Sequence, residues 1–236
     1  MTAITTTADT IPTNRDAQWT QLVWFAGGAT YSFLIPLVFS SLLDLPHDLY
    51  YGVYFGLALA ALAVYVRANH VDLAAFFKTG WFPSLLIGVP ATAFVVGNAL
   101  SRDSTDGPSG FYAAFEVLWR GAIYGSVDAL LLTAFPAMVA LAIVGGRLEG
   151  IAKRLAFVST ALVLTVVITA TYHLGYEQFR EDGVGGPELG NTIISVPTLV
   201  TGNPIGSIAA HASMHVAADV HSYETDLFLP PQTEAP

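Results

Sequence analysis

Five ionisable side chains stand inside or at the ends of apolar stretches of this sequence, at spacings that could support chemistry. Glu116 and Arg120 are four residues apart, as are His211 and His215. His173 stands near the end of another apolar stretch. Residues four apart share a helix face, so each pair can act together. Because ionisable groups are costly in hydrocarbon and usually mark functional sites there, these five residues are the candidate site.

The residue types suit hydrolysis or metal binding. A Glu and a His can deprotonate a water molecule in a pocket shielded from bulk solvent. Two imidazoles four residues apart can hold one metal ion, and His173, His211, His215 and Glu116 together would make a zinc shell. The same imidazoles are equally suited to hydrogen-bonding a substrate carbonyl. The chain has no cysteine, so disulfides and thiolate ligands are excluded and any metal needs His and carboxylate ligands.

The composition is that of a membrane protein. Of 236 residues, 53% are hydrophobic and only 11% are charged, whereas a soluble domain carries about 25% charged residues. The mean hydropathy of +0.56 agrees. The expected partner is therefore a lipid bilayer. A net charge of −9 argues against a nucleic-acid partner.

Six stretches satisfy the requirement of a spanning helix for roughly 20 mostly apolar residues. They are 22–43, 50–68, 81–100, 111–144, 155–175 and 191–220. The last is interrupted by Gly202, Asn203 and Pro204, which can separate a short re-entrant or interfacial piece from a helix that starts near Ile205. This break should line a cavity or pack on protein because exposed irregular backbone is not stable in lipid. We predict an all-α, polytopic transmembrane helix bundle of about six spans with a broken last span. Residues 1–18 should be a disordered tail, 19–222 a single transmembrane domain, and 223–236 a C-terminal tail.

Basic residues between the spans predict the orientation. Arg15, Arg67, Lys78, Arg147, Lys153 and Arg154 fall on one side of six spans, and only Arg102 and Arg180 fall on the other. By the positive-inside rule the first side is cytoplasmic, which places both termini in the cytoplasm of a plasma-membrane protein. Glu116, Arg120 and His173 then lie in the extracytoplasmic leaflet. We expect them to meet His211 and His215 in one cavity there.

Three segments carry a resemblance to a known family. Residues 115–125 (Phe-Glu-Val-Leu-Trp-Arg-Gly-Ala-Ile-Tyr-Gly) resemble the Glu-Glu-x-x-x-Arg-Gly motif of the CPBP (CAAX protease and bacteriocin-processing) intramembrane endopeptidases. Residues 171–175 resemble their second motif, an apolar helix ending in His, and 198–215 resemble their last, His-x-x-x-Asn after a glycine-containing turn. The order is the same as in the family. The chain departs from the motifs at Phe115, where the family has its first Glu, and at His215, where it has Asn.

The resemblance implies a divergent intramembrane peptidase that hydrolyses a peptide bond. A Glu and a His would activate water, Arg120 would hold Glu116, and His211 with His215 would stabilise the oxyanion. Two alternatives remain open from the residues. One is a metal-dependent membrane hydrolase of a lipid amide or ester with His ligands, zinc being the candidate metal. The other is a non-catalytic multispan protein whose polar cluster fixes helix packing or carries protons or a ligand.

Purely structural roles also fit some of these residues. Glu116 and Arg120 could be an interfacial ion pair, and His173 could cap the last carbonyls of its helix. Asp128 continues the row of Glu116 and Arg120, and we expect it to make a buried polar contact.

Overall fold

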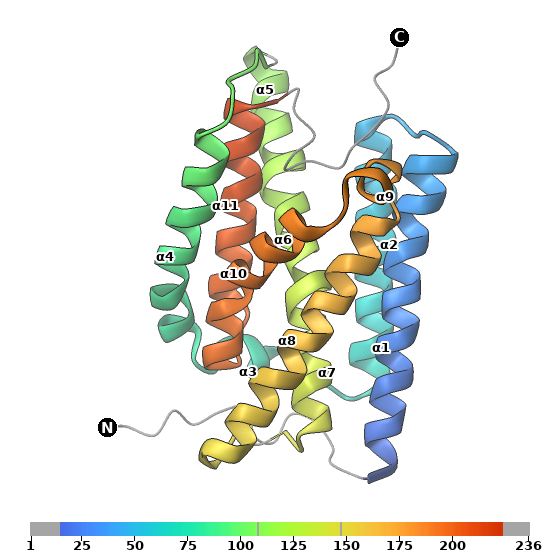
Figure 1. Cartoon of the computed structure of the whole chain (residues 1–236), viewed down its shortest axis with the longest axis vertical. Helices are drawn as coiled ribbons and strands as arrows, with labels where there is room; N and C mark the ends of the chain where they lie inside the picture. The colour runs from blue at the N-terminus through green and yellow to red at the C-terminus, as the bar shows by residue number, and fades with distance from the viewer. Residues whose placement is uncertain (1–14, 108, 147, 224–236) are drawn as a thin grey trace.

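The computed structural model describes residues 15–107, 109–146 and 148–223, and within these ranges the regular structure is helical without strands. Figure 1 shows the helices packed side by side along one long axis. In chain order the elements are α1 (Arg15–Pro36), η1 (Leu37–Leu42), α2 (His47–Ala68), α3 (Leu73–Lys78), α4 (Trp81–Leu100), α5 (Gly110–Glu116), η2 (Val117–Ile123), α6 (Tyr124–Ala129), η3 (Leu130–Ala134), α7 (Phe135–Ile143), α8 (Gly150–Leu174), α9 (Glu177–Asp182), α10 (Gly185–Thr201) and α11 (Ile205–His221), where η marks a π-helical turn. The predicted all-α bundle is confirmed.

Five helices among the described residues are long and apolar enough to cross a bilayer. They are Gln18–Leu42, His47–Ala68, Trp81–Leu100, Gly110–Ile143 and Gly150–Leu174. The chain is therefore an integral, multi-pass membrane protein. These bounds agree within a few residues with the first five predicted spans.

The sixth predicted span is two helices instead. α10 and α11, of 17 residues each, pack against one another as a hairpin. The break between them lies at the end of the bundle, beside α3 (Figure 1). α11 then runs back along α4, from Ser84, whose hydroxyl accepts from the Gly206 amide, to Arg102, whose carbonyl oxygen contacts the His221 ring. The predicted break at Gly202–Pro204 and the predicted helix start near Ile205 are confirmed, and the turn also reverses the chain.

This extra crossing changes the expected placement of the ends. The first residue of α1 and the last of α11 lie at opposite ends of the bundle (Figure 1). The orientation of the termini in a membrane stays a prediction, and an odd number of crossings between these two points would place them on opposite sides. The tails at 1–14 and 224–236 lie outside the described residues, and α1 already begins at Arg15, inside the predicted N-terminal tail.

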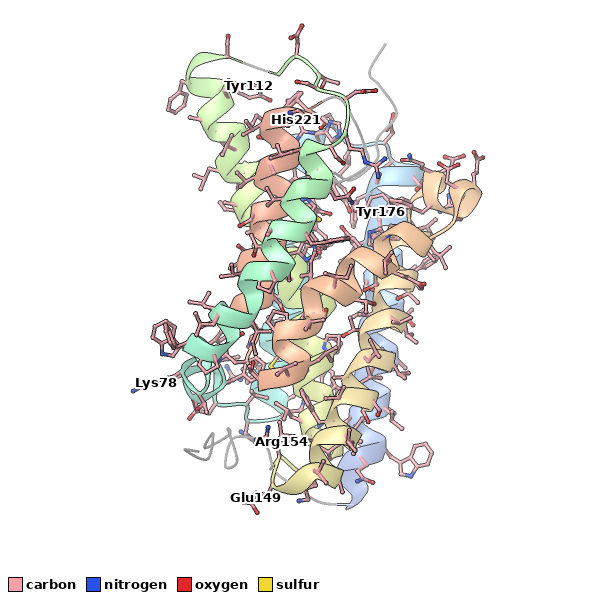
Figure 2. All side chains as sticks on the ribbon, turned by 60° about the vertical axis from the view of Figure 1, so that its left-hand side comes forward. Lys78, Tyr112, Glu149, Arg154, Tyr176 and His221 are labelled. Carbon is pink, nitrogen blue, oxygen red and sulfur yellow. The ribbon has the colours of Figure 1, made fainter. Side chains whose placement is uncertain are left out.

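The Lys and Arg asymmetry is preserved in space. Lys78 and Arg154 lie at one end of the bundle, and Tyr112, Tyr176 and His221 lie at the other (Figure 2). Glu149 lies at the same end as Lys78 and Arg154 (Figure 2), and the orientation that the basic residues predict stays a prediction.

The turn at 202–204 is held by one buried side chain. Asn203 is fully buried, and its Nδ2 donates to the carbonyl oxygens of Phe76, Phe77 and Thr79 at 2.8–3.1 Å. Its Oδ1 accepts from the amide of Ile205 at 2.9 Å, which opens α11. The irregular backbone therefore packs on protein, as membrane energetics require.

The span Gly110–Ile143, here called the central helix, forms the core. It comprises α5, η2, α6, η3 and α7 without interruption, and 83% of its span window is buried, against 28–39% for the other four spans. Every residue from Phe135 to Ala142 is buried. One end of the central helix is thus wholly apolar, and its polar residues lie toward the other end.

Two glycines let α11 approach the central helix closely. A Cβ at Gly121 would lie 3.0 Å from Val216 Cα, and a Cβ at Gly125 would lie 2.7 Å from Ala212 Cα. Gly121 and Gly125 form a GxxxG pair, the pattern that permits backbone contact between membrane helices. This contact brings the polar residues beside the glycines against those of α11.

The hairpin predicts an odd number of crossings between α1 and the end of α11. In a background that has no native cysteine, a Cys replacing His221 should react with a membrane-impermeant maleimide from the same side as Ser104→Cys. Lys153→Cys should react only from the other side. Labelling of the cysteines at 221 and 153 from one side would contradict the hairpin.

The glycine contact predicts a large penalty for added side chains. Gly125→Leu should destabilise the protein by about 1–3 kcal/mol or more, because the new atoms meet backbone that cannot move without opening the helix pair. The matched control is Gly97→Leu, since a Cβ there meets nothing within 4 Å. Unfolding in detergent measures both, and equal stabilities would refute the close approach.

Candidate functional site

An acid and two histidines meet between the central helix and α11. His211 Nε2 lies 3.2 Å from Asp128 Oδ2, and the imidazoles of His211 and His215 stack with centroids 5.0 Å apart. One ligand atom from each of the three residues lies within 4.8 Å of the others, and all three side chains are buried. We call Asp128, His211 and His215 the histidine site.

The second oxygen of the acid is also held. Tyr54 in α2 donates its hydroxyl to Asp128 Oδ1 at 2.6 Å. One carboxylate oxygen therefore faces His211 while the other is fixed by a neutral donor. Hydrogen bonds of this kind orient a carboxylate that serves as a metal ligand.

Further tyrosine hydroxyls form a chain beside the histidine site. Tyr124, which meets the His215 ring edge-on at 4.8 Å, bonds Tyr172, Tyr172 bonds Tyr176, and Tyr176 bonds Tyr50. The four phenols are buried. Each hydroxyl can donate or accept, so the chain supplies a polar lining in an otherwise apolar core.

The contact of the two helices has a regular register. The two helices are antiparallel here, so a residue four positions further along the central helix contacts a residue four positions earlier in α11. The facing side chains are Asp128 with His211, Tyr124 with His215 and Arg120 with Asp219. An α-helix drifts by about 40° over four residues, and the wider π turn η2 winds back part of this drift. The row that begins at Glu116 therefore still faces α11 at Asp128.

The residues predicted at the start of this row form a second, separate cluster. Arg120 Nε lies 3.3 Å from Glu116 Oε2 and 3.9 Å from Asp219 Oδ1, and all three side chains are buried. The Tyr223 ring lies 4.2 Å from the guanidinium carbon. We call Glu116, Arg120 and Asp219 the ionic cluster. It combines two carboxylates with one guanidinium, so Arg120 pairs with both.

The ionic cluster and the histidine site are at different depths. Glu116 is twelve residues before Asp128 on one continuous helix, which corresponds to a separation on the order of 15–18 Å along the axis. The structure thus separates the predicted set. It brings His211 and His215 together and adds Asp128, but it puts Glu116 and Arg120 elsewhere.

A cavity of about 160 Å³ adjoins the histidine site. Asp128, His211 and His215 line it together with His173, whereas Glu116 and Arg120 do not. Three of the five predicted residues therefore share one cavity. Toward the end of the bundle that carries α9, its walls include Asn98 and Arg102.

His173 has a defined orientation. Its Nδ1 lies 2.8 Å from the carbonyl oxygen of Thr169 in the preceding turn. A carbonyl can only accept, so Nδ1 carries the proton and, in the neutral ring, Nε2 keeps its lone pair. Asn191, also on the cavity wall, donates to Thr169 Oγ1 at 2.7 Å and braces the same turn.

Sequence reasoning undervalued Asp128 and missed the tyrosines. Asp128 was assigned only a buried polar contact, although its spacing from Glu116 already placed it on the row facing α11. The tyrosine pairs Tyr50 with Tyr54 and Tyr172 with Tyr176 have the same spacing of four. Tyrosines usually gather at membrane interfaces, so buried pairs at this spacing were a usable signal.

Comparisons of the chain with protein-family models, with curated proteins and with solved structures gave no match. The resemblance to the CPBP endopeptidases therefore depends on the three sequence motifs alone.

The ionic cluster predicts a structural role for Arg120. Arg120→Met should destabilise the protein by about 3–5 kcal/mol, because two carboxylates would remain buried without their cation. Neutralising them as well, in Glu116→Gln/Arg120→Met/Asp219→Asn, should recover much of that loss. Denaturation in detergent measures both variants. A loss below about 0.5 kcal/mol for Arg120→Met would contradict the pairing.

Proposed function

We propose that this chain is a metal-dependent membrane hydrolase whose metal ion, zinc being the natural candidate, is held by Asp128, His211 and His215. The observation that carries the proposal is the convergence of these three ligand atoms within 4.8 Å in a buried site beside a cavity. Two histidines and one carboxylate are a known catalytic zinc set, which leaves the fourth position for water or substrate.

The donor set fits a divalent ion chemically. His211 Nδ1 has no hydrogen-bond partner among the described residues, and Nε2 faces the carboxylate. A cation between Asp128 and the two imidazoles would balance the carboxylate charge inside a membrane span, where an uncompensated charge is costly. Tyr54 would fix the carboxylate from behind.

The cavity supplies the remaining chemistry. A bound metal lowers the pKa of its water and polarises a carbonyl. His173, with Nδ1 tied to Thr169, lines the same cavity and would offer its Nε2 there as a proton acceptor. Asn191 keeps this turn in place, so its role is to position His173.

The proposed substrate is an amphiphile with an ester or amide bond. Phe94, Val95, Ile194 and Met214 give the cavity an apolar wall that suits a hydrocarbon chain, and Arg102 lies at its polar side. If the end of the bundle with Lys78 and Arg154 faces the cytoplasm, as basic residues favour, Arg102 belongs to the opposite face of the plasma membrane. A lipid could then reach the site within the bilayer.

Metal titration tests this proposal. Purified chain stripped with a chelator should bind one Zn²⁺ or Co²⁺, and His211→Ala and Asp128→Ala should abolish the binding. Tyr54→Phe should weaken the affinity about 10- to 100-fold, as removal of a hydrogen bond to a metal ligand usually does. His70→Ala is the control, because this loop histidine does not line the cavity. Wild-type protein that binds no metal would refute the proposal.

An intramembrane peptidase similar to the CPBP family is the second candidate, because His173, His211 and His215 share one cavity. The two candidates differ at Glu116. A peptidase that uses Glu116 as its base would lose hydrolysis in Glu116→Gln, whereas the metal-dependent hydrolase keeps its turnover per folded molecule. Peptide and lipid reporters embedded in the membrane distinguish the substrates.

A further inference from the structure

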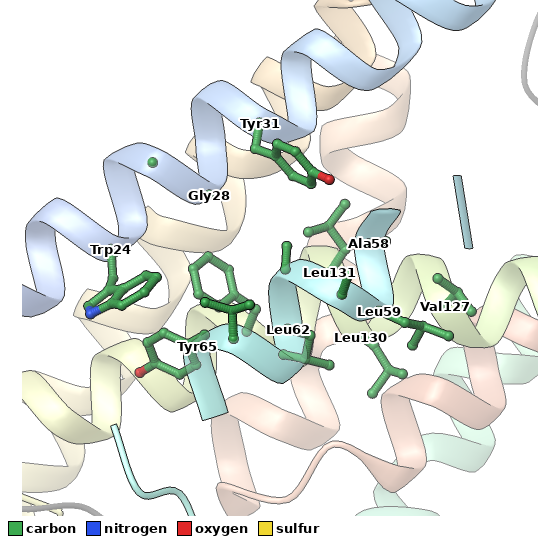
Figure 3. Close-up of a pocket in the computed structure, with 15 residues that line it drawn as sticks. Trp24, Gly28, Tyr31, Ala58, Leu59, Leu62, Tyr65, Val127, Leu130 and Leu131 are labelled. Carbon is green, nitrogen blue, oxygen red and sulfur yellow. The ribbon is translucent and has the colours of Figure 1, made fainter. Parts of the chain in front are cut away.

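A second cavity lies on the membrane-facing side of the bundle, away from the histidine site. It has a volume of about 380 Å³ and is enclosed by α1, α2 and the part of the central helix around η3 (Figure 3). Trp24 and Tyr31 form its α1 wall, Ala58 and Tyr65 belong to its α2 wall, and Leu131 to the central helix. We call this space the α1–α2 groove.

Missing side chains create the groove. Gly27 and Gly28 stand on its α1 wall, and a Cβ at Gly27 would meet nothing within 4 Å. Alanines fill much of the facing segment of α2. Tyr31 closes one end by bonding the carbonyl oxygen of Leu57 at 3.4 Å, and Trp24 meets Tyr65 edge-on at 5.9 Å at the other.

The polarity of the groove excludes water and headgroups. Among the described residues that line it, none is charged. The Tyr65 hydroxyl is already bonded to Gln21 Oε1, and the Tyr31 hydroxyl to Leu57. Water needs two or more polar partners, which this lining does not offer. An empty groove of this size would forgo dispersion contacts along its whole lining.

The depth of the groove restricts the occupant further. Trp24 and Tyr31 lie 6 and 13 residues into the span that begins at Gln18, which puts them at about 9 and 20 Å of depth. The hydrocarbon core is about 30 Å thick. Leu59 and Val64, at the mouth, are 43% and 56% exposed, so the groove opens sideways into that core.

From these observations we infer that the α1–α2 groove is a binding site for one hydrocarbon chain of a membrane lipid, which enters laterally between α1 and α2. The mouth lies at the depth of the hydrocarbon core, and apart from the Trp24 indole N–H and two tyrosine hydroxyls the lining side chains are apolar. The site is distinct from the proposed hydrolase centre, because Val127 and Leu131 face the groove while Asp128 and Leu132 face the other cavity.

Lipid retention tests the inference without any assay of hydrolysis. The full chain is reconstituted in nanodiscs of dioleoylphosphatidylcholine and extracted in mild detergent. Native mass spectrometry then measures the mass of the protein together with any lipid it retains. Wild type should retain one phospholipid per chain. Gly27→Leu, which fills the groove, should lower retention at least tenfold. Gly56→Leu is the matched control, since this helical glycine also has no atom within 4 Å of its Cβ and does not line the groove.

A second pair of variants protects the test against misfolding. Ala61→Phe fills the groove from α2, and Ala63→Phe places the same ring on the exposed side of that helix. Added lipid should raise the unfolding temperature of wild type, Gly56→Leu and Ala63→Phe, but not of the two filled variants. The inference would be overturned if Gly27→Leu retained as much lipid as wild type, or if wild type retained none. A retained polyene or isoprenoid without a glycerophosphate headgroup would overturn the assignment to a membrane lipid. Loss of zinc binding bears only on the proposed hydrolase.

Discussion

A carboxylate inside the most buried span must be compensated, and the arrangement around Asp128 follows from that requirement. In hydrocarbon an unpaired charge is costly, so the carboxylate needs partners at both oxygens. His211 from α11 and Tyr54 from α2 provide them. Two helices that are distant in sequence are thereby fixed against the central helix at one depth.

That contact is possible only because the backbones come close. Asp128 has a short side chain, and Gly125 allows α11 to approach until a Cβ at this position would touch Ala212. The register of α11 is set at its other end by Asn203, whose amide group caps α3 and whose oxygen opens α11. A turn at the end of the bundle thus determines which residues of α11 meet the central helix.

Hydropathy and spacing predicted the fold class and most of the spans, because a bilayer requires long apolar helices. They also predicted that His211 and His215 act together. The break and a helix starting near Ile205 were predicted, but the reversal of the chain at that point was not, since the Gly202–Pro204 turn reads equally well as a break within one span. One continuous span would run in the direction opposite to α11. For this reason we expected Glu116 to lie at the same depth as the histidines, which it does not.

The spacing of Asp128 from Glu116 suggested a shared row, but neither its exact face nor its pairing could be derived from spacing alone. The i, i+4 row drifts around an ideal helix, and only the π turn η2 keeps Glu116 and Asp128 on one line. A π turn leaves no clear mark in a single sequence. The motif resemblance likewise implied catalytic roles for Glu116 and Arg120. Their spacing of four residues is equally compatible with a structural ion pair.

The spatial separation of the two polar clusters argues for a division of roles. In the ionic cluster a guanidinium lies between two carboxylates, so opposite charges are paired within the protein, although Glu116 Oε1 and Oε2, Arg120 Nε and Asp219 Oδ1 make no hydrogen bond among the described residues. In the histidine site a single carboxylate faces two imidazoles beside a cavity, and His211 retains a ring nitrogen with no hydrogen bond among the described residues. A cluster whose opposite charges pair with each other stabilises the fold, whereas three ligand atoms that converge within 4.8 Å beside a cavity can accept a metal ion. The physical case for chemistry therefore centres on Asp128, His211 and His215, and Arg120 with its two acids holds the end of α11 against the helix that carries them.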